Sequence, residues 1–333
     1  MRRPQLHRRF LPVVADNAGG PDRLDAIVLC PGLIQNRFSF EAPTRSLPAF
    51  LMRRGFCIYV LEPHGRHRHA SGPRADRLQD VLSEDVVPQV SELLVRHRQV
   101  SWVGHSLGGL IGLLLPENVS NRLTSMVTVG TPLLPAMGAF GFRGVDRLVA
   151  ATSRRLHRRH VPLPGKWVGR AFRVFQPAMN FPGARYPLQI YAPGSMHPAD
   201  LGFFLKNSWA QDSFGVVCDL IELLLHEGDA PDGLPLGERL RALVPPLLVI
   251  GGDLDGLAPP KAVKALFERA GSPEKSLRMF GRREHGVRFG HMDLLIGKAA
   301  PRTVWPAIAD FLQKHHAVTR PVAAMKAPGT SRQ

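Results

Sequence analysis

The sequence lacks the features that define membrane-spanning, secreted and disulfide-rich proteins. No apolar run approaches the roughly 18–20 residues needed to cross a bilayer, which excludes an integral membrane protein. The basic residues at 1–9 are not followed by the apolar stretch and small-residue cleavage site of a signal peptide, so we do not expect secretion. The three cysteines, Cys30, Cys57 and Cys218, are too few for a disulfide framework and lack the spacing of a zinc site. Together these absences predict a cytoplasmic protein in a reducing compartment.

Acidic residues are scarce in three segments of the chain, and this gives the protein a positive net charge. The 333 residues include 43 Lys and Arg against 27 Asp and Glu, for a net charge of +16. Residues 1–15 and 314–333 each contain four basic residues and no acidic one, and residues 132–182 contain nine basic residues and one acidic residue, Asp146. These three segments carry the whole excess, so the basic character is confined to two tails and one internal block.

What the sequence does contain is a regular alternation of apolar runs and amphipathic segments. A hydrophobic content of 44% is ordinary for a globular chain with a buried core. An apolar run without polar alternation indicates a strand that is buried on both faces, as in a parallel sheet. The runs predicted as strands, the last of them weaker than the others, are 25–30, 56–61, 100–104, 125–129, 247–250 and 276–280.

Helical patterns lie between these runs. Residues 77–97 place apolar side chains on one stripe of a helix, which Pro88 is expected to kink. Residues 302–313 show the same pattern and predict a closing helix. Strands that alternate with helices predict an α/β fold with a mostly parallel central sheet and helices on both faces.

The alternation stops between residues 132 and 243, where proline and glycine are frequent. We interpret this region as a mainly helical cap inserted after the strand at 125–129, with a basic amphipathic helix near 144–160. The predicted organisation is a basic N-terminal tail at 1–19, a core made of 20–131 and 244–315, the cap at 132–243, and a disordered basic tail at 316–333.

One turn has the pattern of a nucleophile elbow. Gly104-His105-Ser106-Leu107-Gly108-Gly109 follows a predicted strand and opens an apolar helix. In such a turn the serine has a strained backbone conformation, glycines let the strand and the helix pack closely, and the hydroxyl stands clear of the sheet edge. The sequence therefore predicts Ser106 as a catalytic nucleophile. We assign no separate role to His105, which belongs to the elbow itself.

A serine nucleophile needs a base, and the base needs a carboxylate that orients it. The turn after the strand at 247–250 offers two candidate acids, Asp253 and Asp255, at the expected edge of the sheet. The loop after the last strand offers two candidate bases, His285 and His291. Position in the chain alone leaves both choices open.

Backbone N–H groups must also hold the oxyanion of a tetrahedral intermediate. One donor is expected at Leu107, directly after the nucleophile. The other is expected in the loop after the strand at 25–30, where Gly32 permits a tight bend and Leu33 follows it. The backbone N–H groups of Leu33 and Leu107 are therefore the predicted oxyanion hole.

Taken in chain order, these motifs resemble those of the α/β-hydrolase superfamily over about residues 20–315. The matching segments are Pro31-Gly32, the elbow at 104–109, the turn from Gly252 to Pro259, and Gly290-His291-Met292-Asp293. The resemblance implies the serine esterase and lipase-like branch with a cap insertion. The family's acid lies in a G-x-x-D-x-x-x-P turn and its base in a G-H-x-D/E run, which favours Asp255 over Asp253 and His291 over His285. One departure is Pro31-Gly32, which stands where the family usually has His-Gly.

The predicted activity is that of a serine hydrolase that cleaves a carboxylic ester with a hydrophobic acyl or alcohol group, through an acyl-enzyme on Ser106. No metal or organic cofactor is implied. Thioesterase and acyltransferase activities stay open as alternatives because they use the same triad. A non-catalytic ligand- or partner-binding protein on this scaffold is an alternative from another class, since a fold does not establish an activity.

The basic segments bear on possible partners. Between residues 132 and 182, cationic side chains alternate with large apolar ones such as Trp167, Phe172 and Phe175. This pattern is typical of peripheral contact with an anionic membrane, here expected at the inner face of the cell membrane. Nucleic acid is not an expected partner because no recognition motif is present. The expected partner is a small-molecule or lipid ester substrate, and no obligatory protein partner is evident.

Overall fold

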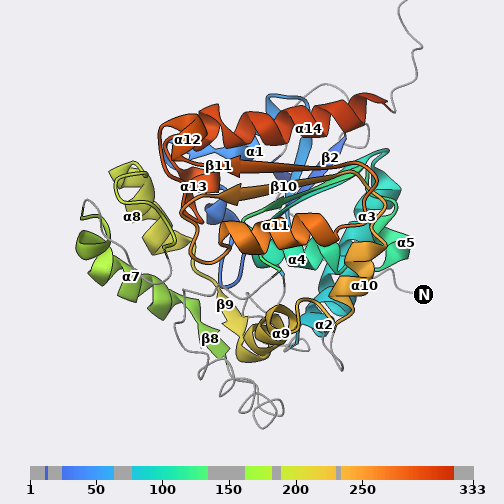
Figure 1. Cartoon of the computed structure of the whole chain (residues 1–333), viewed down its shortest axis with the longest axis horizontal. Helices are drawn as coiled ribbons and strands as arrows, with labels where there is room; N and C mark the ends of the chain where they lie inside the picture. Colours follow the sequence, from blue (N-terminus) through green and yellow to red (C-terminus); the bar gives the residue numbers. More distant parts are fainter. Residues whose placement is uncertain are drawn as a thin grey trace, which may run out of the picture.

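The computed structural model describes residues 12–13, 25–63, 77–133, 162–181, 189–229 and 234–318, which surround a central sheet (Figure 1). In these residues the sheet has the strand order β1-β5-β2-β6-β7-β10-β11, and β1 alone runs antiparallel to its neighbour. The strands are β1 (Pro12–Val13), β2 (Ala26–Cys30), β5 (Cys57–Val60), β6 (Val100–His105), β7 (Ser125–Val129), β10 (Leu247–Gly252) and β11 (Lys275–Phe280). The predicted mostly parallel sheet is confirmed, and every predicted strand is present.

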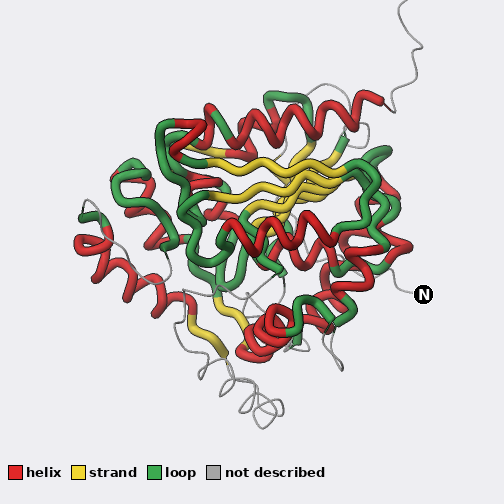
Figure 2. The backbone as a smooth tube through the Cα atoms, viewed as in Figure 1, coloured by secondary structure: helices red, strands yellow, loops and turns green. Residues whose placement is uncertain are grey.

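Both faces of the sheet are buried under helices (Figure 2). Along β2, Ala26, Val28 and Cys30 belong to one hydrophobic core, whereas Ile27 and Leu29 belong to the other, as the two-residue period of a strand requires. The core that contains Ala26 also includes residues of α3 (Val87–Arg96), α4 (Leu107–Leu113) and α11 (Pro260–Arg269). The core that contains Ile27 also includes residues of α1 (Leu47–Met52), α13 (Asp293–Ile296) and α14 (Val304–Val318). Burial on both faces explains why the strands are continuous apolar runs.

The helix predicted over residues 77–97 is present but is not uniform. It consists of α2 (Leu78–Asp80), a π-helical segment at Val81–Val86, and α3. Pro88 lies in the first turn of α3 and has no N–H to donate to the carbonyl one turn earlier. The wider π-helical turn therefore falls where proline interrupts the regular hydrogen-bond pattern.

Helices also dominate the described part of the region predicted as a cap. Its elements are β8 (Pro162–Pro164), α7 (Gly165–Met179), α8 (Pro198–Asn207), β9 (Gln211–Ser213), α9 (Phe214–Leu225) and α10 (Leu236–Arg241). In Figure 1, α7 and α8 lie beyond the carboxyl ends of the parallel strands, whereas α10 packs against α4 and α11. The basic helix predicted near 144–160 lies outside the described residues.

None of the described helices has the length and apolarity needed to cross a membrane. Several short elements lie between the main helices and strands. The short elements are β3 (Glu41–Ala42), β4 (Arg45–Ser46), α5 (Glu117–Ser120), α12 (Arg282–His285) and the 3-10 turns Arg37–Ser39 and Ala300–Arg302.

The structure corrects the two predicted tails. Within the tail expected at 1–19, Pro12–Val13 forms β1 and pairs with β5, which would otherwise be an unprotected edge strand. The closing helix, expected at 302–313, begins at Val304 and continues to Val318, so the disordered tail does not begin at residue 316 as predicted. The helix extends further because His316 is buried against the sheet.

His316 ties the end of α14 to the amino-terminal edge of the sheet. Its Nε2 lies 2.8 Å from Ser101 Oγ, and its Nδ1 lies 3.2 Å from Asp25 Oδ2. Ser101 Oγ also lies 2.8 Å from Ser125 Oγ. Asp25 directly precedes β2, Ser101 belongs to β6 and Ser125 to β7. His316 therefore connects the last helix directly to the starts of β2 and β6, and to β7 through Ser101.

His316→Ala is expected to lower the free energy of unfolding by about 1–3 kcal/mol, because it removes two buried polar contacts between the last helix and the sheet. Urea unfolding followed by circular dichroism measures this loss. Lys314→Ala is the matched control on the same helix, because the Lys314 side chain is 64% exposed and its ion pair with Glu274 lies at the surface. Equal losses in the two variants would contradict a structural role for His316.

Candidate active site

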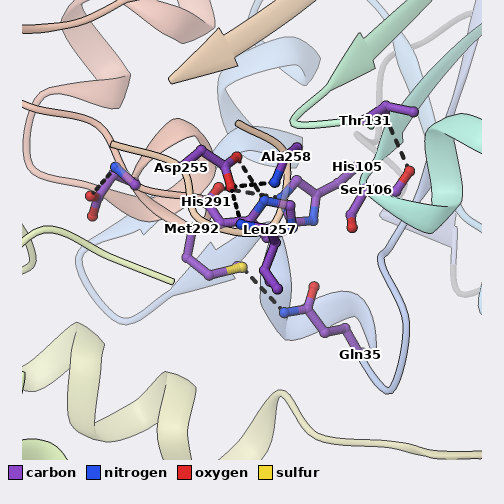
Figure 3. Close-up of polar contacts among 11 residues, drawn as sticks. Gln35, His105, Ser106, Thr131, Asp255, Leu257, Ala258, His291 and Met292 are labelled. Atoms are coloured by element: carbon purple, nitrogen blue, oxygen red, sulfur yellow. Dashed lines mark hydrogen bonds and ion pairs between the residues drawn. The ribbon is translucent and has the colours of Figure 1, made fainter. Parts of the chain in front are cut away.

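The turn between β6 and α4 holds Ser106 in a strained backbone conformation. Its φ of 54° and ψ of −121° lie in a region that costs a non-glycine residue about 1–3 kcal/mol. The Ser106 N–H donates to Val129 O at 2.8 Å. The Ser106 carbonyl accepts from Gly109 N at 2.9 Å and from Thr131 Oγ1 at 3.2 Å, as Figure 3 shows for Thr131. These bonds fix the turn at the carboxyl end of β6, with the serine at the N-terminus of α4.

Glycines on either side of Ser106 permit this turn. A Cβ atom at Gly104 would lie 2.3 Å from Gly108 O, and one at Gly108 would lie 2.1 Å from Cys30 O. The elements β6, α4 and β2 therefore approach one another more closely than any side chain would allow. The glycine spacing around Ser106 is thus a packing requirement, which is why the sequence could reveal the turn.

His291 and Asp255 form a buried hydrogen-bonded pair at the same edge of the sheet (Figure 3). His291 Nδ1 lies 2.8 Å from Asp255 Oδ2, and the two side chains are 3% and 0% exposed. The other carboxylate oxygen, Asp255 Oδ1, accepts from Leu257 N at 2.9 Å and from Ala258 N at 2.7 Å. A carboxylate held in this way fixes the imidazole with its proton on Nδ1, which leaves Nε2 as an acceptor.

Gly130, directly after β7, makes room for this pair. Its φ is +55°, and a Cβ atom there would lie 3.1 Å from both Asp255 Oδ2 and His291 Nδ1. The ends of β7, β10 and β11 are therefore brought together at one point of the sheet edge. Any side chain at position 130 would be both strained and crowded.

His105 packs against His291. The two ring centroids are 4.4 Å apart, and His105 Nε2 lies 3.3 Å from the His291 carbonyl oxygen. Complete burial lowers the pKa of His105 well below its usual value, and the neighbouring His291 lowers it further. His105 is therefore neutral and adds no positive charge beside His291. Sequence reasoning gave His105 no role, because adjacency to Ser106 says nothing about which side chain its ring meets.

Ser106 Oγ forms no hydrogen bond with His291, or with any other side chain in the described ranges. Hydrogen bonds between a nucleophile and its base are often long in a free enzyme and shorten in the complex with substrate. The structure thus joins His291 to Asp255 and places Ser106 at the same edge of the sheet (Figure 3).

The alternative acid and base lie apart from this arrangement. Asp253 accepts from Phe289 N at 2.8 Å, so its carboxylate fixes the loop after β11. The ring of His285 packs against Phe280 and Phe289. Neither residue has a hydrogen bond or ring contact with Ser106 or His291. In the part of the chain that the structure describes, no three His, Cys, Asp or Glu side chains are grouped as a metal site.

The predicted oxyanion donors belong to the loop after β2, which carries Leu33, and to the first residue of α4, Leu107. Neither the Leu33 N–H nor the Leu107 N–H donates a hydrogen bond to another described residue. The loop that carries Leu33 lies close to the elbow, because a Cβ atom at Gly32 would be 3.1 Å from Ser106 Cβ. Among the described residues, neither backbone donor is therefore committed to another hydrogen bond.

Residues near position 210 brace the loop that carries Leu33. Ile34 has a left-handed φ of 52°, and its N–H donates to Asp212 Oδ2 at 2.9 Å. Its carbonyl accepts from Ala210 N at 2.7 Å, and the next residue, Gln35, forms a β-bridge with Trp209. Sequence reasoning missed this contact, since Asp212 lies 178 positions after Ile34 and no local pattern links them.

Asp293 braces the loop that carries His291. Its buried carboxylate accepts from Gly290 N at 2.7 Å, from Ala192 N at 2.7 Å and from Ser195 Oγ at 2.5 Å. Burial raises the pKa of Asp293 to about 6, although these three donors oppose the shift. The Gly-His-x-Asp run contained this residue, but the sequence alone assigned it no function.

The comparisons with known proteins agree with this geometry. A family model described as the alpha/beta hydrolase fold matches residues 25–291, a span that contains Ser106, Asp255 and His291. The chain therefore belongs to the alpha/beta hydrolase fold family, as its motifs predicted. No curated protein matches the chain.

Solved structures of lipases and esterases share the fold at low sequence identity. The monoacylglycerol lipase of Paleococcus ferrophilus is 16% identical with a TM-score of 0.61, and the match covers 87% of this chain and 94% of the lipase. A structure from a study of carboxylesterases of Nitrososphaera gargenis is 16% identical with a TM-score of 0.59, covering 90% and 93%. A soluble variant of the Saccharomyces cerevisiae monoglyceride lipase is 15% identical with a TM-score of 0.58, covering 88% and 87%. At these identities the likeness establishes the fold.

Asp293→Asn is expected to remove a pH-dependent contribution to the free energy of unfolding. The pKa of Asp293 in the folded protein is raised to about 6 from its usual 3.8, so the folded protein binds more protons than the unfolded chain between these values. This contribution is fully present below about pH 4 and is lost as the pH rises through about 6. The unfolding free energy of the wild type minus that of the variant should therefore fall by roughly 2–3 kcal/mol between about pH 4 and pH 7.

Urea unfolding of both proteins at each pH measures this difference. Ser195→Ala supplies a second arm, because it removes a donor that lowers the pKa of Asp293 and should extend the window to higher pH. A difference between wild type and Asp293→Asn that does not change with pH would contradict the assignment.

Proposed function

We propose that the protein is a serine hydrolase that cleaves a carboxylic ester, with Ser106 as nucleophile, His291 as general base and Asp255 as the orienting acid. The observation that most supports this proposal is the buried His291–Asp255 pair, which is fixed by backbone donors at the sheet edge where Ser106 stands in a strained turn. A serine nucleophile, a histidine base and a carboxylate that orients the base are the groups that acyl transfer by a serine hydrolase requires.

In the first half-reaction, Ser106 Oγ attacks the acyl carbon of the ester while His291 Nε2 takes the hydroxyl proton. The carbonyl electron pair moves onto oxygen, and the N–H groups of Leu33 and Leu107 hold the resulting oxyanion. The intermediate collapses as its bond to the alcohol oxygen breaks, and His291 passes the proton to that oxygen. Water then attacks the acyl-enzyme by the same steps, which releases the acid and restores the serine.

Two neighbours of His291 support its role. Asp255 keeps the imidazole in the tautomer that accepts at Nε2 and stabilises the positive charge that forms on it. The lowered pKa of His105 keeps that ring neutral, so it does not oppose the imidazolium at a centroid distance of 4.4 Å.

The proposed substrate is an ester with a hydrophobic acyl or alcohol group. The partly buried side chains of Leu33, Ile34 and Leu257 belong to the same loops as the proposed catalytic groups, and Met292 follows His291 directly. Lipases and carboxylesterases among the similar structures support the same substrate class.

Ser106→Ala and His291→Ala are each expected to lower kcat for a p-nitrophenyl ester by about 10⁶-fold, and Asp255→Asn by about 10⁴-fold. A fluorophosphonate should label the wild type on Ser106, as mapped by mass spectrometry, and should fail to label the Ser106→Ala and His291→Ala variants. Asp253→Asn is the matched control, since this acid lies two positions from Asp255 and fixes a loop instead of a histidine.

An adduct on a residue other than Ser106 would overturn the proposal, as would labelling that survives the loss of His291. Equal losses of kcat in Asp253→Asn and Asp255→Asn would refute the assignment of the acid. A folded protein that takes no label in the presence of lipid would favour the binding-protein alternative.

Asp212→Ala is expected to lower kcat by about 10²-fold with little change in KM, because the loop that carries the Leu33 N–H loses its brace. Asp212→Asn keeps an acceptor oxygen and should retain most of the rate. Asp229→Ala is the control, because its carboxylate is 51% exposed. A loss confined to KM, or equal losses in the Asn and Ala variants, would argue against positioning by Asp212.

A further inference from the structure

The helix α7 has apolar side chains on two opposite faces, although only one of them packs against the protein. Its inner face carries Gly165, Gly169, Phe172 and Met179. Its outer face carries Trp167, Ala171, Val174 and Ala178, spaced by four, three and four residues, so that they form one continuous stripe. A surface helix of a globular protein normally presents polar residues on that outer face. Packing within the protein therefore does not account for the apolar residues of the outer stripe.

The large side chains of this outer face are exposed to solvent. Trp167 is 65% exposed, Val174 74% and Phe175 64%, and Phe181, which follows the helix, is 70% exposed. These four account for half of the large hydrophobic side chains exposed among the described residues, and they are gathered on α7 and directly after it. Scattered exposed apolar residues are normal, but a contiguous group marks an interaction surface.

A basic stripe runs beside the apolar one. Lys166, Arg170 and Arg173 are exposed and share the same helical spacing, offset by one position from Trp167 and Val174. Arg170 lies over the Trp167 ring at 4.8 Å, and none of the three cations forms an ion pair with a described residue. The helix contains no acidic residue.

The orientation of α7 is fixed, so the stripe cannot turn inward. A Cβ atom at Gly169 would lie 2.2 Å from Trp209 Cδ1, and one at Gly165 would lie 1.8 Å from Ala210 O. Phe172 stacks on Trp209 with ring centroids 5.4 Å apart. Glycine at these two positions lets the inner face of α7 pack directly against Trp209 and Ala210.

We propose that the outer face of α7 is a docking surface for an anionic lipid bilayer. Trp167, Val174 and Phe175 enter the interface between headgroups and acyl chains, while Lys166, Arg170 and Arg173 meet the lipid phosphates. Charge complementarity favours this occupant, because a helix with a pure basic stripe beside an apolar one matches an anionic apolar surface. A second copy of the chain would instead bring two basic stripes together.

The position of α7 gives the docking a consequence for the site. In Figure 1 the arrows of β10 and β11 point toward the side of the molecule where α8 and α7 lie. Asp255 and His291 lie in the segments that follow these strands, so a bilayer on α7 would lie on the same side as the candidate active site. The docking itself does not depend on Ser106, and it can be tested on the Ser106→Ala variant whether or not the protein is a hydrolase.

Co-sedimentation of the full chain with vesicles tests the proposal. Binding should be strong to phosphatidylcholine vesicles that contain about 30% phosphatidylglycerol and weak to phosphatidylcholine alone. The double variants Arg170→Glu/Arg173→Glu and Val174→Ser/Phe175→Ser should each weaken binding by about tenfold or more. Matched controls at other exposed positions are Arg96→Glu/Arg98→Glu and Val95→Ser/Val244→Ser, which should bind as the wild type does.

Tryptophan fluorescence locates the contact. The other three tryptophans, Trp102, Trp209 and Trp305, are 0%, 7% and 3% exposed, so quenching by brominated lipid should report Trp167 and should disappear in Trp167→Phe. Equal binding to both kinds of vesicle would overturn the proposal, as would α7 variants that bind like their controls. A dimer in solution that Val174→Ser/Phe175→Ser abolishes would also overturn it, because the face would then bind a second copy.

Discussion

The close approach of β6, α4 and β2 around Ser106 is the constraint on which the rest of the candidate site depends. A φ of 54° costs a serine about 1–3 kcal/mol, and it persists only because the surroundings leave no alternative. Gly104 and Gly108 remove the side chains that would separate the three elements, and Thr131 and Val129 bond the backbone of the turn. The geometry of the serine is thus enforced by packing and backbone hydrogen bonds, while its own side chain stays uncommitted.

The other groups reach the same edge by long-range bracing. Asp255 and His291 follow β10 and β11, and their contact needs the empty space beside Gly130 at the end of β7. Two loops of the site are then held by segments from the region predicted as a cap: Asp212 bonds Ile34, and Ala192 bonds the Asp293 that fixes Gly290. That region therefore holds two loops of the candidate site, the one that carries Leu33 and the one that carries His291.

The sequence predicts the parts of this molecule whose cause is local. Strands buried on both faces produce continuous apolar runs, and the close packing at the elbow requires glycines at fixed spacing from Ser106, so both are visible in the chain. The choice of Asp255 over Asp253 needed a family resemblance, because both acids follow the same strand. The partners of His105, Asp212 and His316 escaped prediction, since each pairs residues from distant elements and depends on how those elements are placed in space. β1 and the end of α14 were not predicted for the same reason, since contacts with strands far away in sequence stabilise them.

The residues that brace the loop carrying Leu33 also contact α7, the helix with the exposed stripe. Gly165 begins this helix, and a Cβ atom there would lie 1.8 Å from Ala210 O and 3.3 Å from Ile34 Cβ. Ala210 in turn donates to the carbonyl of Ile34, next to the proposed donor Leu33. Ala210 therefore lies between two parts of the molecule. One is the loop at the proposed reaction centre, and the other is α7, whose outer face is apolar and basic. If α7 docks on a bilayer as proposed, a force on this helix would act on the loop that carries Leu33 through this contact, because close-packed groups move together. The proposed membrane docking would thus be coupled by position to the geometry of the candidate site, with no need for a large rearrangement.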